Sequence, residues 1–525
     1  MVFTPGSGGQ GGRNWCRCDQ CGYAAGWCGQ HATPPRDDDT RLIGGSWYIE
    51  NVKAELDAPD EWYFDGDAGL LYLRPNRSSP GKRRQGPLPP PKYPDLVASH
   101  LDTLVRIVGS QAEPVSKITI RGIGFRDTAS TYMREFEWGA PSGGDWALRR
   151  GGAVFVEGAE EVQISDCTFT RLDGNAIFLS RYTRNVSIVN NEFSFIGEGA
   201  MATWGETQKY DATGGDFPMY TLIKQNYIRE IGIYEKQSSG WGQAKACAST
   251  ITENIMFNMP RAAINFNDMM GGGNLVSKNL LWNTCRESGD HGPINTWDRM
   301  PFLTTLKDGK PSFDPEVTRV TDNFIFANYG GSQGIDNDDG SSWYDISHNV
   351  FYSADGFKMD YGGHDSAFRD NLVVVLPYDG QNCYNVGPFL PDHVDLFKNN
   401  TCVCGASTDR IPSGCGSPAC RDHSSSWLPL GTMRSREAVM RLSNVREVNM
   451  EIVATVSECD ISVGGAMLAK NNRYFTPLNN ASLDCGGTQL SLADANSNFG
   501  IEEGSTQSGL PEPSEILQWA EDMMV

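Results

Sequence analysis

Short apolar strands that end near an aspartate or asparagine recur along the chain. The Asp and Asn markers stand at residues 166, 191, 226, 254, 279, 323, 349, 371 and 400, in segments such as VSIVNNEF (186–193) and YDISHNVFY (344–352). A base period in the low-to-mid twenties with occasional insertions is typical of a solenoid. Because the repeats are rich in β-forming residues and glycine turns, they predict an all-β chain folded as a right-handed parallel β-helix.

A second apolar strand follows most markers and suggests where a site would lie. In each of these strands the first and third residues are mostly apolar and should point inward, because side chains alternate along a strand. The second and fourth residues form the other face, which we expect to point outward and to change from neutral to polar to acidic. These residues are Phe178, Ser180, Ala202, Trp204, Asn265, Asn267, Asn295, Trp297, Asp336, Asp338, Lys358 and Asp360.

Two aspartates on this face are candidates for acid–base catalysis. Asp338 and Asp360 are 22 residues apart, so they should lie on adjacent coils. Parallel strands stack about 4.8 Å apart, which would leave the carboxyl groups about 5 Å apart, as in retaining glycosidases. Such proximity should raise one pKa and leave one proton donor and one nucleophile or base. Asp336 and Asp290 are close substitutes for this pair.

Further residues near this face are predicted to bind substrate. Trp297 and Trp204 would act as platforms for sugar rings, and amides and basic side chains would bind hydroxyl groups. The remaining predicted binding residues are Asn265, Asn267, Asn295, His291, Arg299, Lys358 and His364. As alternatives, the acidic stripe is simply solvated or binds Ca²⁺ through its carboxylates. We expect no other metal or cofactor.

The chain divides into three predicted segments. Residues 1–100 are an irregular, Cys-rich start followed by a β-hairpin, in which EWYFD and LLYLR flank a turn. Residues 101–500 form the β-helix with loop insertions, and residues 501–525 form a tail and helix. Ser514 is the expected N-cap of that helix, and Ile516, Leu517, Trp519 and Ala520 its apolar face, which would cover an end or side of the sheets.

Composition narrows the possible partners and the compartment. The net charge of −21 argues against nucleic acid as a partner, and no apolar stretch is long enough for membrane insertion. Fourteen cysteines favour disulfides and an oxidising compartment, with Cys167, Cys247 and Cys285 expected as buried thiols. Sequons at Asn76, Asn185, Asn399 and Asn480 fit a secreted glycoprotein. The start does not resemble a signal peptide, so we expect that the signal peptide is missing from this sequence. We expect the secreted protein to be a monomer.

Several segments resemble secreted right-handed β-helix proteins of carbohydrate metabolism, which have the pectate-lyase-like fold. They are GDHGPINTWDRMPFL (289–303), QGIDNDDGSSWYDISHNVFY (333–352), GFKMDYGGHDSAF (356–368) and the preceding segment YIENVKAELDAPDEWYFD (48–65). The closest group is the β-helix glycoside hydrolases that include α-L-fucosidases and xylanases. The resemblance implies a glycoside hydrolase of plant or algal polysaccharides or oligosaccharides, with an acidic pair in an outward groove.

Two other functions stay open. The same fold can carry a polysaccharide lyase or uronate epimerase, for which Lys358, Arg299, His291 and Tyr361 are candidate basic or proton-abstracting residues. A non-catalytic glycan-binding solenoid would use Trp204 and Trp297 and show no turnover.

Overall fold

The computed structural model divides the chain into two compact units, which we describe one at a time. Unit 1 comprises residues 1–274, 279–316 and 328–332, and unit 2 comprises residues 275–278, 317–327 and 333–525. Within these units the structure describes residues 2–3, 49–59, 61–74, 97–132, 134, 149–267, 270–287, 291–307, 309–326, 333–360, 362–375, 383–387, 389–404, 451–456, 466–477 and 479–524.

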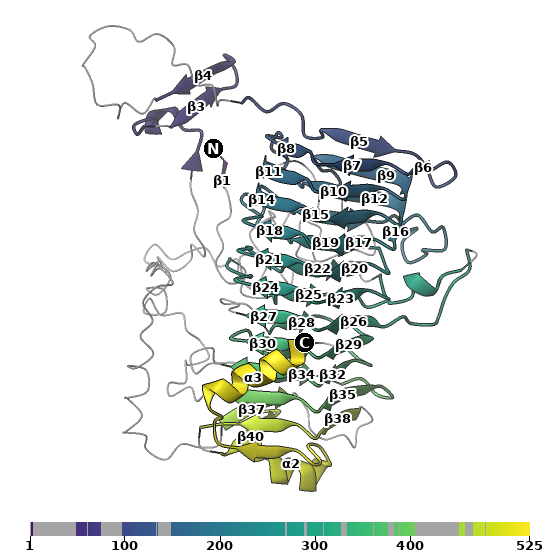
Figure 1. The fold of residues 1–525 in the computed structure, drawn as a ribbon, viewed down its shortest axis with the longest axis vertical. Coiled ribbons are helices and arrows are strands. Elements are labelled where there is room, and N and C mark those ends of the chain that lie inside the picture. Colours follow the sequence, from purple (N-terminus) through teal and green to yellow (C-terminus); the bar gives the residue numbers. More distant parts are fainter. Residues whose placement is uncertain are drawn as a thin grey trace, which may run out of the picture. The chain divides into compact units, whose positions relative to one another are not determined.

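The strands of unit 1 form three parallel sheets, in which strands stack in chain order (Figure 1). Sheet a contains β7 (Thr119–Arg121), β10 (Gln163–Ser165), β13 (Ser187–Val189), β17 (Leu222–Lys224) and β20 (Thr250–Thr252). Sheet b contains β8 (Gly124–Arg126), β11 (Thr168–Leu172), β14 (Glu192–Ile196), β18 (Tyr227–Arg229), β21 (Ile255–Phe257) and β24 (Leu280–Trp282). Sheet c contains β5 (Val105–Val108), β9 (Val154–Glu160), β12 (Ile177–Arg184), β15 (Met201–Trp204), β19 (Trp241–Ala244), β22 (Ile264–Asn267) and β25 (Ile294–Thr296), with the short β6 (Val115–Ser116) and β16 (Pro218–Met219) beside β9 and β12.

Unit 2 repeats this arrangement. Sheet a contains β23 (Leu275–Ser277), β26 (Thr318–Thr321), β29 (Tyr344–Ser347), β32 (Ala367–Arg369), β35 (Val394–Lys398) and β38 (Ala466–Lys470). Sheet b contains β27 (Phe324–Phe326), β30 (Val350–Tyr352), β33 (Leu372–Val375), β36 (Thr401–Cys404), β39 (Arg473–Phe475) and β42 (Thr506–Ser508). Sheet c contains β28 (Ile335–Asn337), β31 (Phe357–Asp360), β34 (Tyr384–Gly387), β37 (Glu451–Val456), β40 (Ala481–Cys485) and the antiparallel β41 (Thr488–Ser491). The predicted right-handed parallel β-helix is confirmed.

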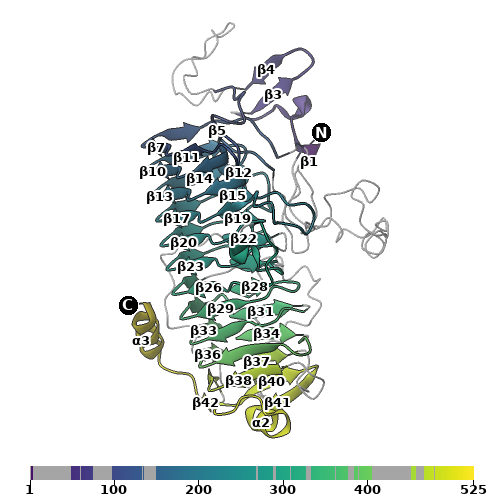
Figure 2. The same ribbon diagram turned by 90° about the vertical axis from the view of Figure 1, so that its right-hand side faces the viewer.

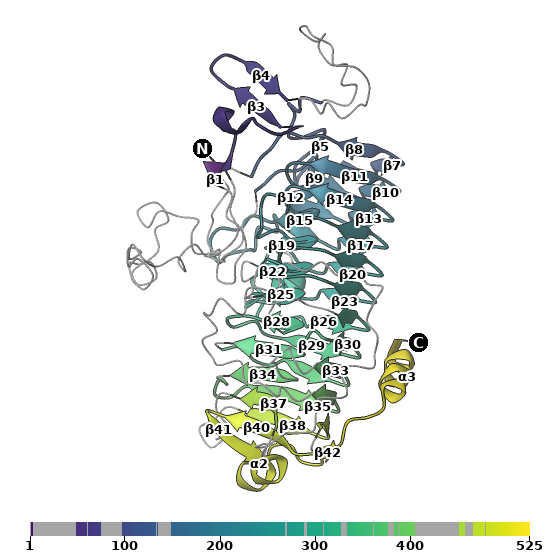
Figure 3. The ribbon, with the colours of Figure 1, turned by 90° about the vertical axis from the view of Figure 1, so that its left-hand side faces the viewer.

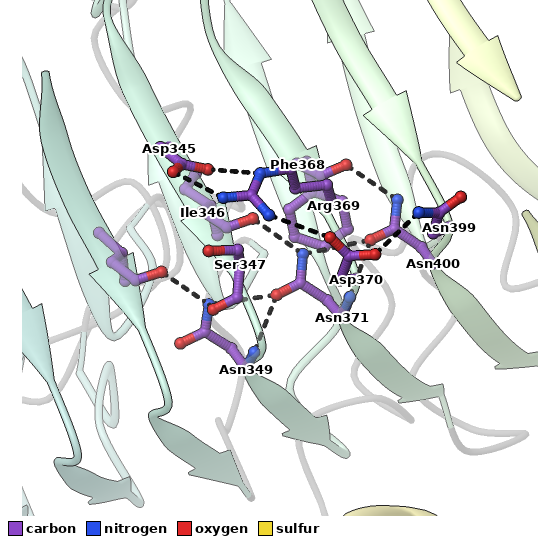
Figure 4. A network of polar contacts seen from close by, with 11 residues as sticks. Asp345, Ile346, Ser347, Asn349, Phe368, Arg369, Asp370, Asn371, Asn399 and Asn400 are labelled. Atoms are coloured by element: carbon purple, nitrogen blue, oxygen red, sulfur yellow. Dashed lines mark hydrogen bonds and ion pairs between the residues drawn. The ribbon is translucent and has the colours of Figure 1, made fainter. Parts of the chain in front are cut away.

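The asparagine markers form hydrogen-bonded ladders in the turns between sheets a and b. In unit 2, Asn371 Oδ1 accepts from the backbone N–H and the side chain of Asn349 at 3.0 and 3.1 Å. Asn371 in turn donates to Ile346 O and Asn400 Oδ1 (Figure 4). Each asparagine follows a residue with left-handed backbone, such as Asp370 with φ 55°. These side chains satisfy buried backbone groups that no sheet can reach.

One marker was placed a residue too early. We took Asp166 as the first of the series, but the backbone N–H of Cys167 is the group that donates to Asn191 Oδ1. Asp166 instead has the left-handed backbone, with φ 55°, and pairs with Arg121 on the surface.

The core of each unit lies between its sheets and consists of the inward residues of every coil. In unit 1, Phe125, Phe169 and Phe193 stack at centroid distances of 4.8 and 4.7 Å. In unit 2, Phe357 stacks on Phe368 at 5.4 Å. The unit 1 stack joins equivalent positions on successive coils, as the period of the repeat requires, whereas the unit 2 pair joins β31 of sheet c to β32 of sheet a across the core.

In the part of the chain that the structure describes, the elements outside the coils are a hairpin, a short strand pair and four helical segments. In unit 1, β3 (Trp62–Asp65) and β4 (Leu70–Leu73) form the predicted antiparallel hairpin, η2 (Lys53–Glu55) precedes it, η3 (Leu303–Thr305) follows sheet c, and β1 (Val2–Phe3) pairs with β2 (Ile49–Glu50). In unit 2, α2 (Leu492–Phe499) lies against β40 and β41 (Figure 3), and α3 (Pro513–Met524) lies beside sheet b (Figures 2 and 3).

Helix α3 covers the outer surface of sheet b in unit 2, as predicted. Ile516, Trp519, Ala520 and Met523 pack against a cluster formed by Val350, Leu372, Val374 and Val403. Two details of the prediction are wrong. The helix begins at Pro513, so Ser514 lies inside its first turn, and Leu517 is 64% exposed.

The described cysteines include disulfide-bonded residues and buried thiols. Cys383 and Cys402 form a disulfide, with Cα atoms 5.9 Å apart. Cys167, Cys247 and Cys285 are buried thiols, as expected, and so is Cys404. The cysteines of the Cys-rich start, which are Cys16, Cys18, Cys21 and Cys28, lie outside the described residues. Among the helices that the structure describes, none is both long and apolar enough to cross a membrane.

Candidate functional site

The second face of sheet c in unit 1 is covered, which corrects our expectation of an open face. Ser180, Trp204 and Asn265 are 0%, 1% and 4% exposed. The reason is that this face packs its own apolar cluster of Phe155, Phe178, Ala202, Trp204 and Ala244.

Trp204 is therefore not an exposed sugar platform. The Arg150 guanidinium lies 5.0 Å from the centre of the Trp204 ring and donates to Trp204 O at 2.8 Å. Trp204 is 1% exposed, so in this arrangement its ring offers no open face for stacking on a sugar.

Beyond Trp204, the same face carries a narrow pocket lined by amide and hydroxyl groups. Its cavity volume is only about 20 Å³, and its polar lining consists of Asn175, Gln237, Ser238, Ser239, Gln243, Asn265 and Asn267. Gln243 is held in place because it accepts from Trp241 Nε1 at 3.2 Å and donates to Asn274 Oδ1 at 3.1 Å. Asn265 and Asn267, predicted to bind hydroxyl groups, are thus brought together here.

The coil that follows carries more of the predicted residues. Arg261 Nη2 lies 3.2 Å from Asn295 Oδ1 and 3.4 Å from His291 Nδ1, and all three residues are buried. Trp297 is half-buried, and the guanidinium of Arg299 lies 4.6 Å from the centre of its ring. Asp290 lies outside the described residues.

Two buried glutamates lie in the turns that lead from sheet b to sheet c on adjacent coils of unit 1. Glu198 Oε1 accepts from the Thr131 hydroxyl at 2.6 Å. Glu235 Oε1 accepts at 3.0 Å from the backbone N–H of Gln237, a residue of the amide-lined pocket. The turns themselves are joined, since Glu235 N donates to Gly197 O.

Burial shifts the titration of both carboxyl groups. Loss of solvent raises the pKa of Glu198 to about 7. It raises the pKa of Glu235 to about 8, and the negative charge of Glu198 adds to that rise. Two neighbouring carboxyl groups that titrate near neutrality are a common mark of a catalytic site.

Glu198 and Glu235 are not among the site residues predicted from the sequence, because those predictions rest mainly on strand positions. Both residues stand in connecting turns, in the segments GEGA (197–200) and EKQSSG (235–240). Glu198 stands three residues before β15 and Glu235 stands six residues before β19, so the two glutamates share no common position relative to the strands.

A second, wider hollow of unit 1 shares Asn175 with the amide-lined pocket. Its cavity volume is about 160 Å³, and it is lined by Arg106, Arg149 and Arg150 together with Asp102. Arg149 Nη2 lies 4.0 Å from Asp102, and Arg106 lies 4.9 Å above the Phe155 ring. Three guanidinium groups at one hollow are notable in a chain with a net charge of −21.

The predicted acidic group lies in unit 2 and has a lysine at its centre. Strands β28 and β31 pair with Asp336 opposite Lys358 and with Asn337 opposite Met359, which is the expected 22-residue offset. Lys358 Nζ lies 3.0 Å from Asp336 and 3.7 Å from Asp338. Asp360 ends β31, and its side chain lies outside the described residues.

The lysine changes what this group can do. Asp336 is fully buried and forms an ion pair with Lys358, so the Lys358 ammonium is already held by a carboxylate of the protein. The ammonium stands between the Asp336 and Asp338 carboxylates, where a Ca²⁺ ion would have to lie, so these two residues do not fit a Ca²⁺ site.

His364 stands apart from the sheet c residues. It lies in the turn that enters sheet a of unit 2, where its ring contacts Asp365 and His393.

Comparisons of the sequence with known proteins give no match. No protein-family model matches the chain. No curated protein matches it.

Three solved structures are similar. One is described as a glycoside hydrolase, with a TM-score of 0.47, 18% identity, and coverage of 70% of this chain and 60% of that one. The complex of XylC with xylose has a TM-score of 0.32 and 12% identity, and the match covers 77% of this chain and 54% of that one. The PL6 family alginate lyase AlyGC has a TM-score of 0.26 and 12% identity, and the match covers 74% of this chain and 53% of that one. The chain thus matches between about half and three fifths of each structure, and at these values its function has to be argued from its own residues.

Proposed function

We propose that the chain is a glycoside hydrolase of a plant or algal polysaccharide or oligosaccharide, with its active site on sheet c of unit 1. One observation carries this proposal: an amide-lined pocket lies next to two buried carboxyl groups whose pKa values are about 7 and 8. Glycosidases need one carboxyl group that holds a proton at working pH and a second that is ionised.

The two glutamates can divide these roles. With a pKa of about 8, Glu235 is protonated at neutral pH and can donate a proton to the glycosidic oxygen. Glu198, with a pKa of about 7, is the group that ionises first and can act as nucleophile or base. Asn265 and Asn267 would bind sugar hydroxyl groups through their amides.

The acidic group of unit 2 gives a rival assignment of the catalytic pair. In that assignment Asp338 and Asp360, with Asp336 or Asp290 as substitutes, perform the hydrolysis. We favour the glutamates because the Lys358 ammonium already offsets the negative charge next to Asp338.

A specific observation also supports a second function, a polysaccharide lyase or uronate epimerase. The hollow lined by Arg106, Arg149 and Arg150 adjoins the amide-lined pocket through Asn175. Guanidinium groups pair well with carboxylates, and both reactions must neutralise a uronate carboxylate before a proton is removed.

Isosteric variants separate the two catalytic assignments. Glu235→Gln should lower kcat/KM for hydrolysis about 10²–10⁴-fold, the usual contribution of a general acid. Asp338→Asn should stay within a few-fold of wild type, and so should the control Glu113→Gln, which alters an exposed loop residue. Loss of activity in Asp338→Asn and Asp360→Asn with full activity in Glu235→Gln would move the site to unit 2. Binding of glycans without turnover in the wild type would instead indicate a non-catalytic solenoid.

A further inference from the structure

Two histidines occupy equivalent positions on adjacent coils of unit 2. Strands β32 and β35 pair with Ala367 opposite Leu396, an offset of 29 residues. The same offset relates His364 to His393 in the turns before these strands. Their imidazole rings lie 4.1 Å apart between centroids, with an angle of 44° between the ring planes. The coil repeat therefore places two nitrogen ligands side by side.

A carboxylate lies against both rings. Asp365 Oδ2 is 2.8 Å from His364 Nδ1 and 2.6 Å from His393 Nδ1. One ligand atom from each of the three residues can be chosen so that all lie within 4.8 Å of one another. Ligand atoms that share one ion at about 2.0–2.2 Å lie about 3.4 Å apart in a tetrahedral site, so small shifts of these side chains would suit one ion.

The negative charge of Asp365 faces the two histidines of this cluster. Among the described residues, the ion pairs of Asp365 are those with His364 and His393, and no lysine or arginine joins them. The backbone N–H of Val394 approaches the other oxygen, Oδ1, at 3.5 Å. The backbone of His364 is held by a bridge to Ser342. The three side chains are thus positioned by the coils and are not neutralised by a permanent cation.

The cluster is also accessible to an ion. The side chains of His364 and Asp365 are each 20% exposed, and that of His393 is 36% exposed. Water can therefore reach the cluster and complete a coordination sphere. Imidazole nitrogens together with a carboxylate oxygen are the ligands that Zn²⁺ and related divalent transition metals prefer, whereas Ca²⁺ prefers oxygen alone.

We propose that His364, Asp365 and His393 bind a divalent transition-metal ion, with Zn²⁺ as the best fit, which links two adjacent coils of unit 2. The ion would occupy the position between the two Nδ1 atoms and Asp365 Oδ2, and water would complete its coordination. Because the ion binds the folded coils, it would stabilise unit 2 against unfolding. The site is independent of the proposed catalytic glutamates, so either proposal can fail without the other.

The test is metal binding by the whole chain after removal of metal with a chelator. Titration with Co²⁺ followed by visible absorption should show a nitrogen- and oxygen-ligated ion in the wild type. His393→Gln and Asp365→Asn, both close in shape to the native residues, should weaken this binding at least 10-fold. Zn²⁺ should raise the thermal midpoint of the wild type by a few degrees and not that of the variants. His348→Ala, an exposed histidine of the same unit, is the control and should behave like the wild type.

The readout separates this site from the cysteines of the chain, because thiolate-bound Co²⁺ has intense charge-transfer absorption that a nitrogen and oxygen site lacks. Circular dichroism without metal would show that each variant folds. The proposal is overturned if the wild type binds neither ion, or if both variants bind Co²⁺ as tightly as the wild type does.

Discussion

A single asparagine per coil satisfies several buried polar groups at once. Asn371, which is 1% exposed, accepts from the backbone and side chain of Asn349 and donates to Ile346 O and Asn400 Oδ1. An aspartate could accept in this position but could not donate, and an alanine could do neither. The recurrence of asparagine along the sequence therefore reflects a requirement of the turn rather than a ligand site.

Removing one asparagine of the ladder should be costly. Asn371→Ala would leave the buried backbone N–H of Asn349 and the carbonyl of Ile346 without their partner. We expect a loss of about 2–4 kcal/mol in the free energy of unfolding, since each buried unsatisfied group costs about 1–3 kcal/mol. Denaturant unfolding would measure it, with Asn498→Ala on the exposed surface of α2 as the control. An equal effect of the two substitutions would contradict the ladder's role.

The raised pKa of Glu235 makes a prediction about stability and pH. In the unfolded chain a glutamate titrates near about 4.3, but in the folded chain Glu235 titrates at about 8. Between these values the folded state holds a proton that the unfolded state has lost, so stability falls as the pH rises, by up to about 1.4 kcal/mol per pH unit. Glu235→Gln removes this loss.

The change is read from thermal midpoints at pH 5 and pH 8. The drop between the two values should be smaller for Glu235→Gln than for the wild type, and Glu113→Gln should keep the wild-type drop. If Glu235→Gln shows the same drop as the wild type, Glu235 is not protonated in the folded protein near neutrality.

At the scale of the element, strands could be predicted from sequence and turns could not. The alternation in IFLS and INFN gave the correct inward residues, but the opposite face of sheet c is buried as well. Alternation shows which residues share a face, not what covers that face. The Arg150 side chain on Trp204 comes from a turn two coils away, and no local pattern indicates it.

Helix α3 offers a matched pair of substitutions. Trp519 contacts the outer surface of sheet b, with its ring 5.3 Å from that of Phe475, whereas Leu517 on the same helix is exposed. Trp519→Ala should lower the free energy of unfolding by about 1–3 kcal/mol through lost apolar burial. Leu517→Ala should change it by less than about 0.5 kcal/mol. Similar values for both variants would show that α3 does not pack on the sheet in solution.

At the scale of the molecule, the repeat was enough to predict the fold, but it was not enough to predict where the catalytic residues lie. The spacing of the markers predicts a parallel β-helix because only a coiled chain satisfies such a period. It also predicts the 22-residue offset between β28 and β31. The pairing of Glu198 with Glu235 depends on turns of unequal length, separated by 37 residues, a spacing that the base period does not predict.

The most direct test of the account is the identity of the products. Purified protein is incubated with neutral and uronate-containing polysaccharides, and reducing ends and ultraviolet absorbance are followed together. A hydrolase releases reducing ends without new absorbance, and we predict this result for the wild type and its loss in Glu235→Gln. New absorbance would show an unsaturated product, which would contradict hydrolysis and identify a lyase that uses the arginine-lined hollow.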